Sequence, residues 1–140
     1  MKNYPESMAF LVLAYNHEDY ILEHLESIKY LIRRYADNIC VDIIINDDCS
    51  VDGTVELVDL WLSKNEYLFR SVVKIFNDNN LGTCASILNM LKHVRADALK
   101  ITAGDDVYSF EDIFQYAGLT DDLSILSGIP VGLVGGELIK

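Results

Sequence analysis

The chain has 140 residues, 51% of them hydrophobic and 24% charged, and this composition excludes an intrinsically disordered protein. Its formal net charge of −11 repels a phosphate backbone, which argues against a nucleic-acid partner. No apolar run approaches the roughly 20 residues that a membrane helix needs. Cys40, Cys49 and Cys84 lack C-x-x-C spacing, so they indicate neither a zinc site nor a disulfide framework and favour a reducing, cytoplasmic setting.

Strand-like and helix-like segments alternate along the chain. The strand-like segments are short, apolar or β-branched runs without alternation, as expected for strands that are covered on both faces. The helix-like segments carry apolar residues at a spacing of three and four. The predicted strands are 8–14, 41–45, 71–76 and 98–102, and the predicted helices are 21–35, one after Asp52-Gly53-Thr54, 84–94, and one opened by a capping box at Ser109 and Asp112.

This alternation with short connections predicts one α/β domain over residues 1–140, with a mostly parallel sheet and helices on both faces. Right-handed crossovers place the carboxyl ends of all four strands at one edge of the sheet, where such folds bind ligands. The segments after the strands are polar, at 15–16, 47–48, 77–80 and 105–106. The tail from Ile125 to Leu138 is expected to form one further strand, or a strand pair around a Gly-Gly turn.

Adjacent carboxylates follow the fourth strand, at Asp105 and Asp106. They repel each other, and a hard divalent cation with oxygen ligands relieves that repulsion. In so acidic a chain the cation would also supply the positive charge that a bound diphosphate needs. The pair is therefore interpreted as a metal–diphosphate site. The alternative is an exposed loop before a helix, favoured by the helix dipole.

The other polar loops offer further candidates. Asp47 and Asp48 could accept hydrogen bonds from a base or ribose, or could order their own turn, and one aspartate could do each. Tyr15 could stack on a base, or could simply pack. Gly82 opens the third helix, where free N–H groups would suit an anion.

Two further groups are interpreted structurally. The three histidines, at 17, 24 and 93, lack metal-ligand spacing and are interpreted as surface or boundary residues. The apolar stripe from Cys84 to Val94 is interpreted as core.

Taken together, the segments resemble family 2 glycosyltransferases of the GT-A fold. The opening Leu11 to Asn16, followed by Tyr20-Ile21, is similar to the start of that family, and 44–54 is similar to its D-D-x-S-x-D-G-T element. Residues 80–89 match N-x-G-x(6)-N, and 101–106 lie where the family has its D-x-D-type metal motif. The resemblance covers roughly residues 8 to 115.

The resemblance implies transfer of a sugar from a nucleotide-diphospho-sugar, usually a UDP-sugar, to an acceptor hydroxyl, with Mn²⁺ or Mg²⁺ and with inversion. By position, Ala14 and Tyr15 would line the base pocket, with Asn16 beside them in the nucleotide-binding set. Asp48 would hydrogen-bond the uracil or ribose. Asp105 would lie near the ribose and sugar, and Asp106 would hold the metal. The acceptor is unknown, be it saccharide, lipid or protein, and polysaccharide synthesis is the process the family suggests.

The sequence departs from the family pattern in two ways. The motif reads Gly104-Asp105-Asp106 and not a strict D-x-D. The catalytic base of the family lies later than any matching residue here, since Asp121 and Asp122 come too early, so no catalytic residue is assigned. The acceptor-binding part is expected to be missing, and the chain is expected to bind donor at the inner face of the membrane in a full-length enzyme.

Two other function classes fit parts of the pattern. A non-catalytic nucleotide-binding or interaction module would bind UDP without transferring sugar. A phosphoacceptor receiver domain shares the acidic pair and Mg²⁺, but Lys100 precedes the pair, whereas that domain needs its lysine on a later strand. An unpaired sheet edge would favour self-association into a homo-oligomer.

Overall fold

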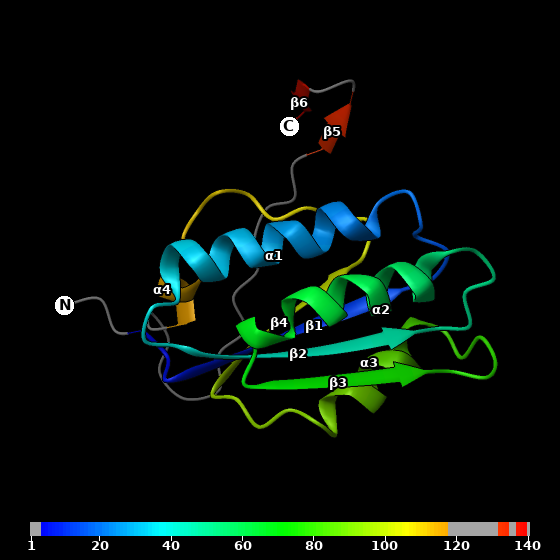
Figure 1. Cartoon of the computed structure of the whole chain (residues 1–140), viewed down its shortest axis with the longest axis horizontal. Helices are drawn as coiled ribbons and strands as arrows, with labels where there is room; N and C mark the ends of the chain where they lie inside the picture. The colour runs from blue at the N-terminus through cyan, green and yellow to red at the C-terminus, as the bar shows by residue number, and fades with distance from the viewer. Residues whose placement is uncertain (1–3, 118–131, 135–136, 140) are drawn as a thin grey trace.

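The computed structural model describes residues 4–117, 132–134 and 137–139. Its centre is a sheet of four parallel strands in the order β3-β2-β1-β4, as Figure 1 shows. The strands are β1 (Ser7–Ala14), β2 (Cys40–Asp47), β3 (Ser71–Phe76) and β4 (Ala98–Ala103). The predicted parallel sheet is therefore confirmed. The chain adds β2 and β3 on one side of β1 and then returns to add β4 on the other side, so the strand order reverses next to β1.

Register brings the carboxyl ends of the strands level with one another. Ala14 is paired with Asp47, Asp47 with Phe76, and Leu13 with Ala103. The loops that follow all four strands therefore leave from one edge of the sheet. The strand order reverses at the neighbouring strands β1 and β4, and the space outside their carboxyl ends is the position at which open α/β sheets hold their ligands.

Helices cover both faces of the sheet, as the sequence predicts. The helices α1 (Ile21–Tyr35) and α2 (Thr54–Asn65) lie on one face, and α3 (Thr83–Leu91) lies on the other (Figure 1). The short helices are η1 (Glu66–Leu68) and α4 (Phe114–Ala117), and α4 packs on the α1 side through Phe114. No helix in the described residues is long and apolar enough to cross a membrane.

The two central strands explain why the sheet forms. Nearly every side chain of β1 and β2 is buried, and successive residues face opposite layers. Phe10 and Ile43 join the large cluster under α1 and α2, whereas Leu11 and Ile44 face α3. Burying one such side chain contributes about 1.5–3 kcal/mol, so the unbroken apolar runs specify the centre of the sheet.

The α3 stripe corrects the sequence interpretation. Of the stripe, Cys84 is exposed, Leu88 is 62% exposed and Leu91 is 40% exposed, while α3 buries Ser86 and Met90 instead. The helix is rotated so that positions 86 and 90 meet the sheet, because the loop before it is fixed by hydrogen bonds described below. Ile87 and Val94, the other apolar residues of the stripe, pack against the cluster on this face, so the stripe is core only in part.

Two predictions about the later chain have different outcomes. The helix after the acidic loop begins at Phe114 and not at Ser109, and Asp112 accepts a hydrogen bond from the Tyr4 hydroxyl at 2.8 Å, so a helix opened at Ser109 is wrong. The strand pair in the tail is confirmed by β5 (Gly132–Val134) and β6 (Glu137–Ile139), which are antiparallel. Its Gly-Gly turn at 135–136, and Asp121 and Asp122, lie outside the described residues.

Candidate functional site

The loop after β1 is joined to the loop after β2 by backbone and side-chain hydrogen bonds. Asn16 takes a left-handed conformation, its amide donates to Ser50 Oγ at 2.9 Å, and its side-chain oxygen accepts from the Val51 amide at 2.9 Å. Glu18 accepts from the Gly53 amide at 2.7 Å. These contacts tie the entry of α1 to the entry of α2 and make the two loops one rigid unit.

Asp47 orders the turn after β2. Its carboxylate accepts hydrogen bonds from both the amide and the hydroxyl of Ser50. Cys49, between them, has a φ of 68°, which an aspartate-stabilised turn makes tolerable. Of the two uses that the sequence allowed for the aspartate pair, Asp47 serves the ordering of the turn.

Asp48 anchors the loop after β3. Its Oδ1 accepts from the Asn77 side chain at 2.9 Å and from the Leu81 amide at 2.7 Å, and its Oδ2 accepts from the Gly82 amide at 2.8 Å. Burial alone would raise the pKa of Asp48, but the hydrogen bonds from Leu81, Asn77 and Gly82 outweigh it and lower the pKa. The N–H groups that seemed free to hold an external anion therefore hold Asp48, which corrects the interpretation of the Gly82 segment.

A hollow of about 360 Å³ opens between the loops after β1, β3 and β4. Ala14 forms part of its wall, Tyr15 is 46% exposed at its side, and Asp48 and Asp105 both reach it. The Asp48 carboxylate accepts from Asn77, Leu81 and Gly82, and the Ser86 side chain is a further hydrogen-bond partner, so about all four of its acceptor positions are used within the protein. The lining residues are Leu13, Ala14, Tyr15, His17, Asp48, Asn80, Gly82, Thr83, Ser86, Ala103 and Asp105.

The acidic loop after β4 packs closely against the rest of the site. The Gly104 amide donates to the Leu13 carbonyl at 2.7 Å, and the Asp106 amide donates to the Ala103 carbonyl at 3.1 Å. A Cβ at Gly104 would lie 2.6 Å from Ile21 Cδ1, so this position has no room for a side chain. The loop is therefore held close to β1, and it presents Asp105 and Asp106 at the surface.

Two histidines that the sequence analysis set aside lie against this loop. His17 Nε2 is 3.7 Å from Asp105 Oδ1, and His17 lines the hollow. His24 is fully buried, with its Nδ1 2.7 Å from the Asp106 carbonyl oxygen, so its interpretation as a surface or boundary residue is wrong. Its spacing of three and four from Ile21 and Ile28, both buried on α1, is the signal that could have placed it inside.

Of the residues predicted from sequence, the hollow brings together Ala14, Tyr15, Asp48 and Asp105. Asn16 is adjacent, but its polar atoms join the loops, and it does not line the hollow. Asp106 is exposed beside Asp105 and is likewise outside the lining. His17, Thr83 and Ser86 are lining residues that the sequence analysis did not single out for this site.

The carboxylates after β4 suit a metal site in which the protein supplies only some of the ligands and a bound phosphate and water supply the rest. Within the described residues, no three His, Cys, Asp or Glu side chains are grouped so as to hold a metal ion. Mg²⁺-type sites often use only one or two carboxylates and complete their shell with phosphate oxygens and water. Asp105 and Asp106, exposed at the mouth of a hollow that could take a phosphorylated ligand, fit that arrangement.

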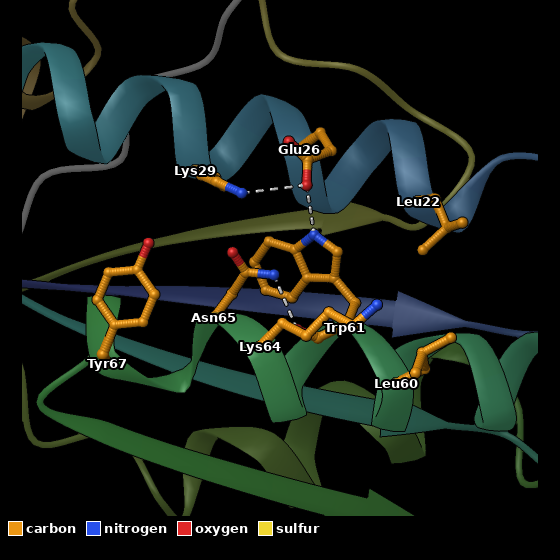
Figure 2. Close-up of a pocket in the computed structure, with 8 residues that line it drawn as sticks. All are labelled: Leu22, Glu26, Lys29, Leu60, Trp61, Lys64, Asn65 and Tyr67. Atoms are coloured by element: carbon orange, nitrogen blue, oxygen red, sulfur yellow. Dashed lines mark hydrogen bonds and ion pairs between the residues drawn. The ribbon is translucent and has the colours of Figure 1, made fainter.

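A second hollow, of about 420 Å³, lies between α1 and α2, away from the strand ends (Figure 2). Its polar groups already pair with one another: the Trp61 indole N–H donates to Glu26 at 2.7 Å, Lys29 lies 3.6 Å from Glu26, and Asn65 donates to the Trp61 carbonyl. None of the four strand-end loops reaches it. The smaller hollow at the sheet edge is therefore the candidate site.

Comparison with known families decides the relationship of this chain. The sequence model described as glycosyl transferase family 2 matches residues 9–123, which include every loop of the site. The chain belongs to glycosyl transferase family 2. Its fold is the GT-A fold: the chain is similar to a mannosyltransferase of Pyrobaculum calidifontis, solved with GDP-Man and Mn²⁺, with a TM-score of 0.72 and 20% identity over 86% of this chain and 34% of that one.

Three further proteins are similar to this chain over about three quarters of its length. TarS of S. aureus, solved with UDP, gives a TM-score of 0.64 at 22% identity, over 79% of this chain and 31% of that one. The abequosyltransferase RfbV of Salmonella typhimurium is 29% identical over 106 residues, 76% of this chain and 30% of that protein. An uncharacterised Mycobacterium tuberculosis protein is 28% identical over 102 residues, which are 73% of this chain and 28% of that protein. The chain thus spans less than a third of the length of these curated relatives.

Proposed function

We propose that this family 2 domain binds a nucleotide-diphospho-sugar, with UDP as the nucleotide, and that the protein transfers the sugar to an acceptor hydroxyl. The observation that carries the proposal is the convergence of Tyr15, Asp48 and Asp105 on one hollow at the reversal point of the sheet. That the solved relatives were obtained with GDP-Man and Mn²⁺ or with UDP supports a nucleotide ligand and a divalent cation. The choice of UDP rests on the sequence resemblance.

Each residue has a distinct part in the proposed binding. The half-exposed ring of Tyr15 offers a face for the base, and Ala14 leaves the space beside it. Asp48 lines the hollow and, as the sequence resemblance implies, accepts a hydrogen bond from the base or the ribose, a bond for which the ligand would compete with Ser86. Asp105 faces the ribose and sugar, and Asp106 holds Mn²⁺ or Mg²⁺. The bound cation would neutralise the charge of the diphosphate leaving group.

Inversion at the anomeric carbon and a cytoplasmic setting belong to the same proposal. Inversion requires a carboxylate base for the acceptor hydroxyl, and we assign none in this chain. Binding of the nucleotide and transfer of the sugar are therefore tested separately. Binding of UDP without transfer by this chain would identify it as a donor-binding module.

The test is calorimetric titration of UDP into the 140-residue chain, first with Mn²⁺ and then with excess chelator. We expect binding that requires the cation, because a net charge of −11 opposes binding of a diphosphate alone. Asp106→Ala should abolish the metal-dependent binding, and Asp48→Ala should weaken what binding remains under either condition.

Asp59→Ala is the matched control, since Asp59 is an exposed carboxylate on α2 that pairs with Lys74 and lies outside both hollows. It should bind as the native chain does. Native-like binding by the Asp48 and Asp106 variants would show that the nucleotide, if bound, sits elsewhere.

A further inference from the structure

His24 lies behind the acidic loop, on the side of α1 that faces the core. Its side chain is 0% exposed, although histidine is rarely so deeply buried without a reason. Its neighbours along the buried side of the helix are Ile21, Leu25 and Ile28. At such a position an apolar side chain would fill the space with no polar atom to satisfy.

The ring makes one directed polar contact. Nδ1 is 2.7 Å from the carbonyl oxygen of Asp106, and because a carbonyl can only accept, Nδ1 carries the proton. Within the described part of the chain, Nε2 is buried without a hydrogen-bond partner. A buried orphan nitrogen costs about 1–3 kcal/mol, so the histidine lowers stability and its visible gain is the bond to Asp106.

Ser27, on α1, and the Tyr108 ring make further contacts to the same segment. Ser27 Oγ donates to the His24 carbonyl at 2.6 Å and accepts from the Tyr108 amide at 3.2 Å. The Tyr108 ring lies 5.6 Å from the His24 ring, and its hydroxyl is 2.9 Å from Thr102 Oγ1. The backbone is thus held at the carbonyl of 106 and again at the amide of 108, two residues later.

We infer that His24 is a positioning residue for the acidic loop: its Nδ1–H fixes the backbone of Asp106 and, through it, the direction of the Asp106 carboxylate. The expected effect of His24 on metal affinity rests on the proposed function, whereas the anchoring of the loop by His24 does not. Partners that orient a metal ligand from behind commonly change metal affinity tenfold to a hundredfold when they are removed.

The test compares two substitutions of His24 with a control in the full 140-residue chain. His24→Asn keeps a donor near the place of Nδ1, whereas His24→Leu fills the space without one. Ile28→Ala is the control, because Ile28 is equally buried one turn further along α1 and its truncation destabilises the fold while leaving the hydrogen bonds to the loop in place.

Two readouts are needed. The first is the apparent Mn²⁺ affinity at saturating UDP: His24→Leu should weaken it by about tenfold or more, and His24→Asn should remain within about threefold of the native chain. The second is amide hydrogen exchange without ligand, measured at Asp106 and Tyr108. His24→Leu should speed exchange there about tenfold relative to Ile28→Ala, with rescue by His24→Asn.

The two readouts separate this inference from the proposed function. Absence of Mn²⁺-dependent UDP binding in the native chain would refute the proposed function, and the exchange data would still decide whether His24 anchors the loop. Native exchange rates at 106 and 108 in His24→Leu would overturn the inference. So would equal effects of His24→Leu and Ile28→Ala on either readout.

Discussion

Asp48 sits where the sequence resemblance expects a contact to the nucleotide, yet its carboxylate also holds the protein together. It joins the end of β2 to the loop before α3 through Asn77, Leu81 and Gly82. The negative charge therefore serves as an internal anion at the start of a helix, a favourable place for it. Loss of Asp48 should affect the shape of the hollow as well as any contact to a ligand.

Replacing Asp48 with asparagine should lower the free energy of unfolding by about 2–4 kcal/mol, because the amide cannot accept from both Leu81 and Gly82 while Asn77 donates to it as well. Urea denaturation would measure the change. Asp78→Asn, which removes the same charge from an exposed position in the loop after β3 that Asp48 holds, should stay within about 0.5 kcal/mol of the native chain. Equal stability of both variants would mean that the Asp48 anchor does not form in solution.

The lowered pKa of Asp52 makes the stability of the folded chain depend on pH. Burial alone would raise its pKa, but hydrogen bonds from Thr54 and the Glu18 amide outweigh this and lower the pKa below the ordinary value of 3.8. Because the pKa of Asp52 is lower in the folded chain than in the unfolded chain, ionised Asp52 stabilises the fold. This contribution is fully present above the ordinary pKa and is lost as the pH falls through the lowered pKa.

The native chain should therefore lose stability as the pH falls below about 4, and Asp52→Asn should show a shallower loss, since it removes one titrating group. Denaturant titrations between about pH 2.5 and 5 would measure both slopes. Asp48 also contributes to the native slope, so the variant should retain part of it. Parallel curves for the two chains would contradict the assigned hydrogen bonds of Asp52.

At the scale of elements, close packing between β1, α1 and the loop after β4 determines where the acidic pair lies. Gly104 is the point of closest approach, between the Leu13 carbonyl, His17 and Ile21. Its role is steric, because a Cβ there would meet Ile21 Cδ1 at 2.6 Å and His17 Nδ1 at 3.0 Å. A glycine before the acidic pair was visible in the sequence, but its reason was not.

Gly104→Ala should destabilise the chain by about 1–3 kcal/mol and weaken Mn²⁺-dependent UDP binding, because the loop must move away from α1. Thermal unfolding and the titration described above would measure the two effects. Gly53→Ala is the matched comparison. Its Cβ would meet the end of the flexible Glu18 side chain at 2.9 Å, so its loss should be smaller, about 0.5 kcal/mol. A larger loss for Gly53→Ala would contradict the packing described for Gly104.

Sequence patterns predicted the elements unevenly. The four strands and α1 were predicted closely, because continuous apolar runs and a 15-residue amphipathic helix are strong local signals. The rotation of α3 was not, because Cys84, Leu88 and Leu91 form as regular a stripe as the residues that are buried. The side of that helix that meets the sheet is set by tertiary contacts: Asp48 binds the amides just before the helix, and Met90 packs on the sheet.

At the scale of the whole molecule, the two faces of the sheet are covered unequally. The cluster under α1 and α2 is much larger than the one under α3. On the α3 side, Leu88, Leu91 and Leu99 are 62%, 40% and 40% exposed, and among the described residues β4 pairs with β1 alone. Exposed apolar side chains on one face and an unpaired strand edge both favour association.

We expect the 140-residue chain to form dimers through this side, more strongly at high salt, because salt screens the repulsion between chains of charge −11. Sedimentation velocity over a range of concentrations would measure it. Leu88→Glu should shift the equilibrium toward monomer by about tenfold, whereas Leu60→Glu, at a 54% exposed leucine of α2 on the opposite side, should not. A monomer at every concentration, or equal effects of both variants, would contradict this expectation.

The sequence by itself determined the strand and helix order, the polar loops at one sheet edge, the family, and four of the residues that line the hollow, namely Ala14, Tyr15, Asp48 and Asp105. These follow from local periodicity and from motifs read in order along the chain. Only the tertiary structure decided that the amides of Leu81 and Gly82 hold Asp48, that His24 lies buried behind Asp106, and that Asn16 joins two loops. The partners in these contacts are 33, 34, 82 and 35 residues apart, and no local pattern specifies pairings that exist only once the sheet has brought its loops together.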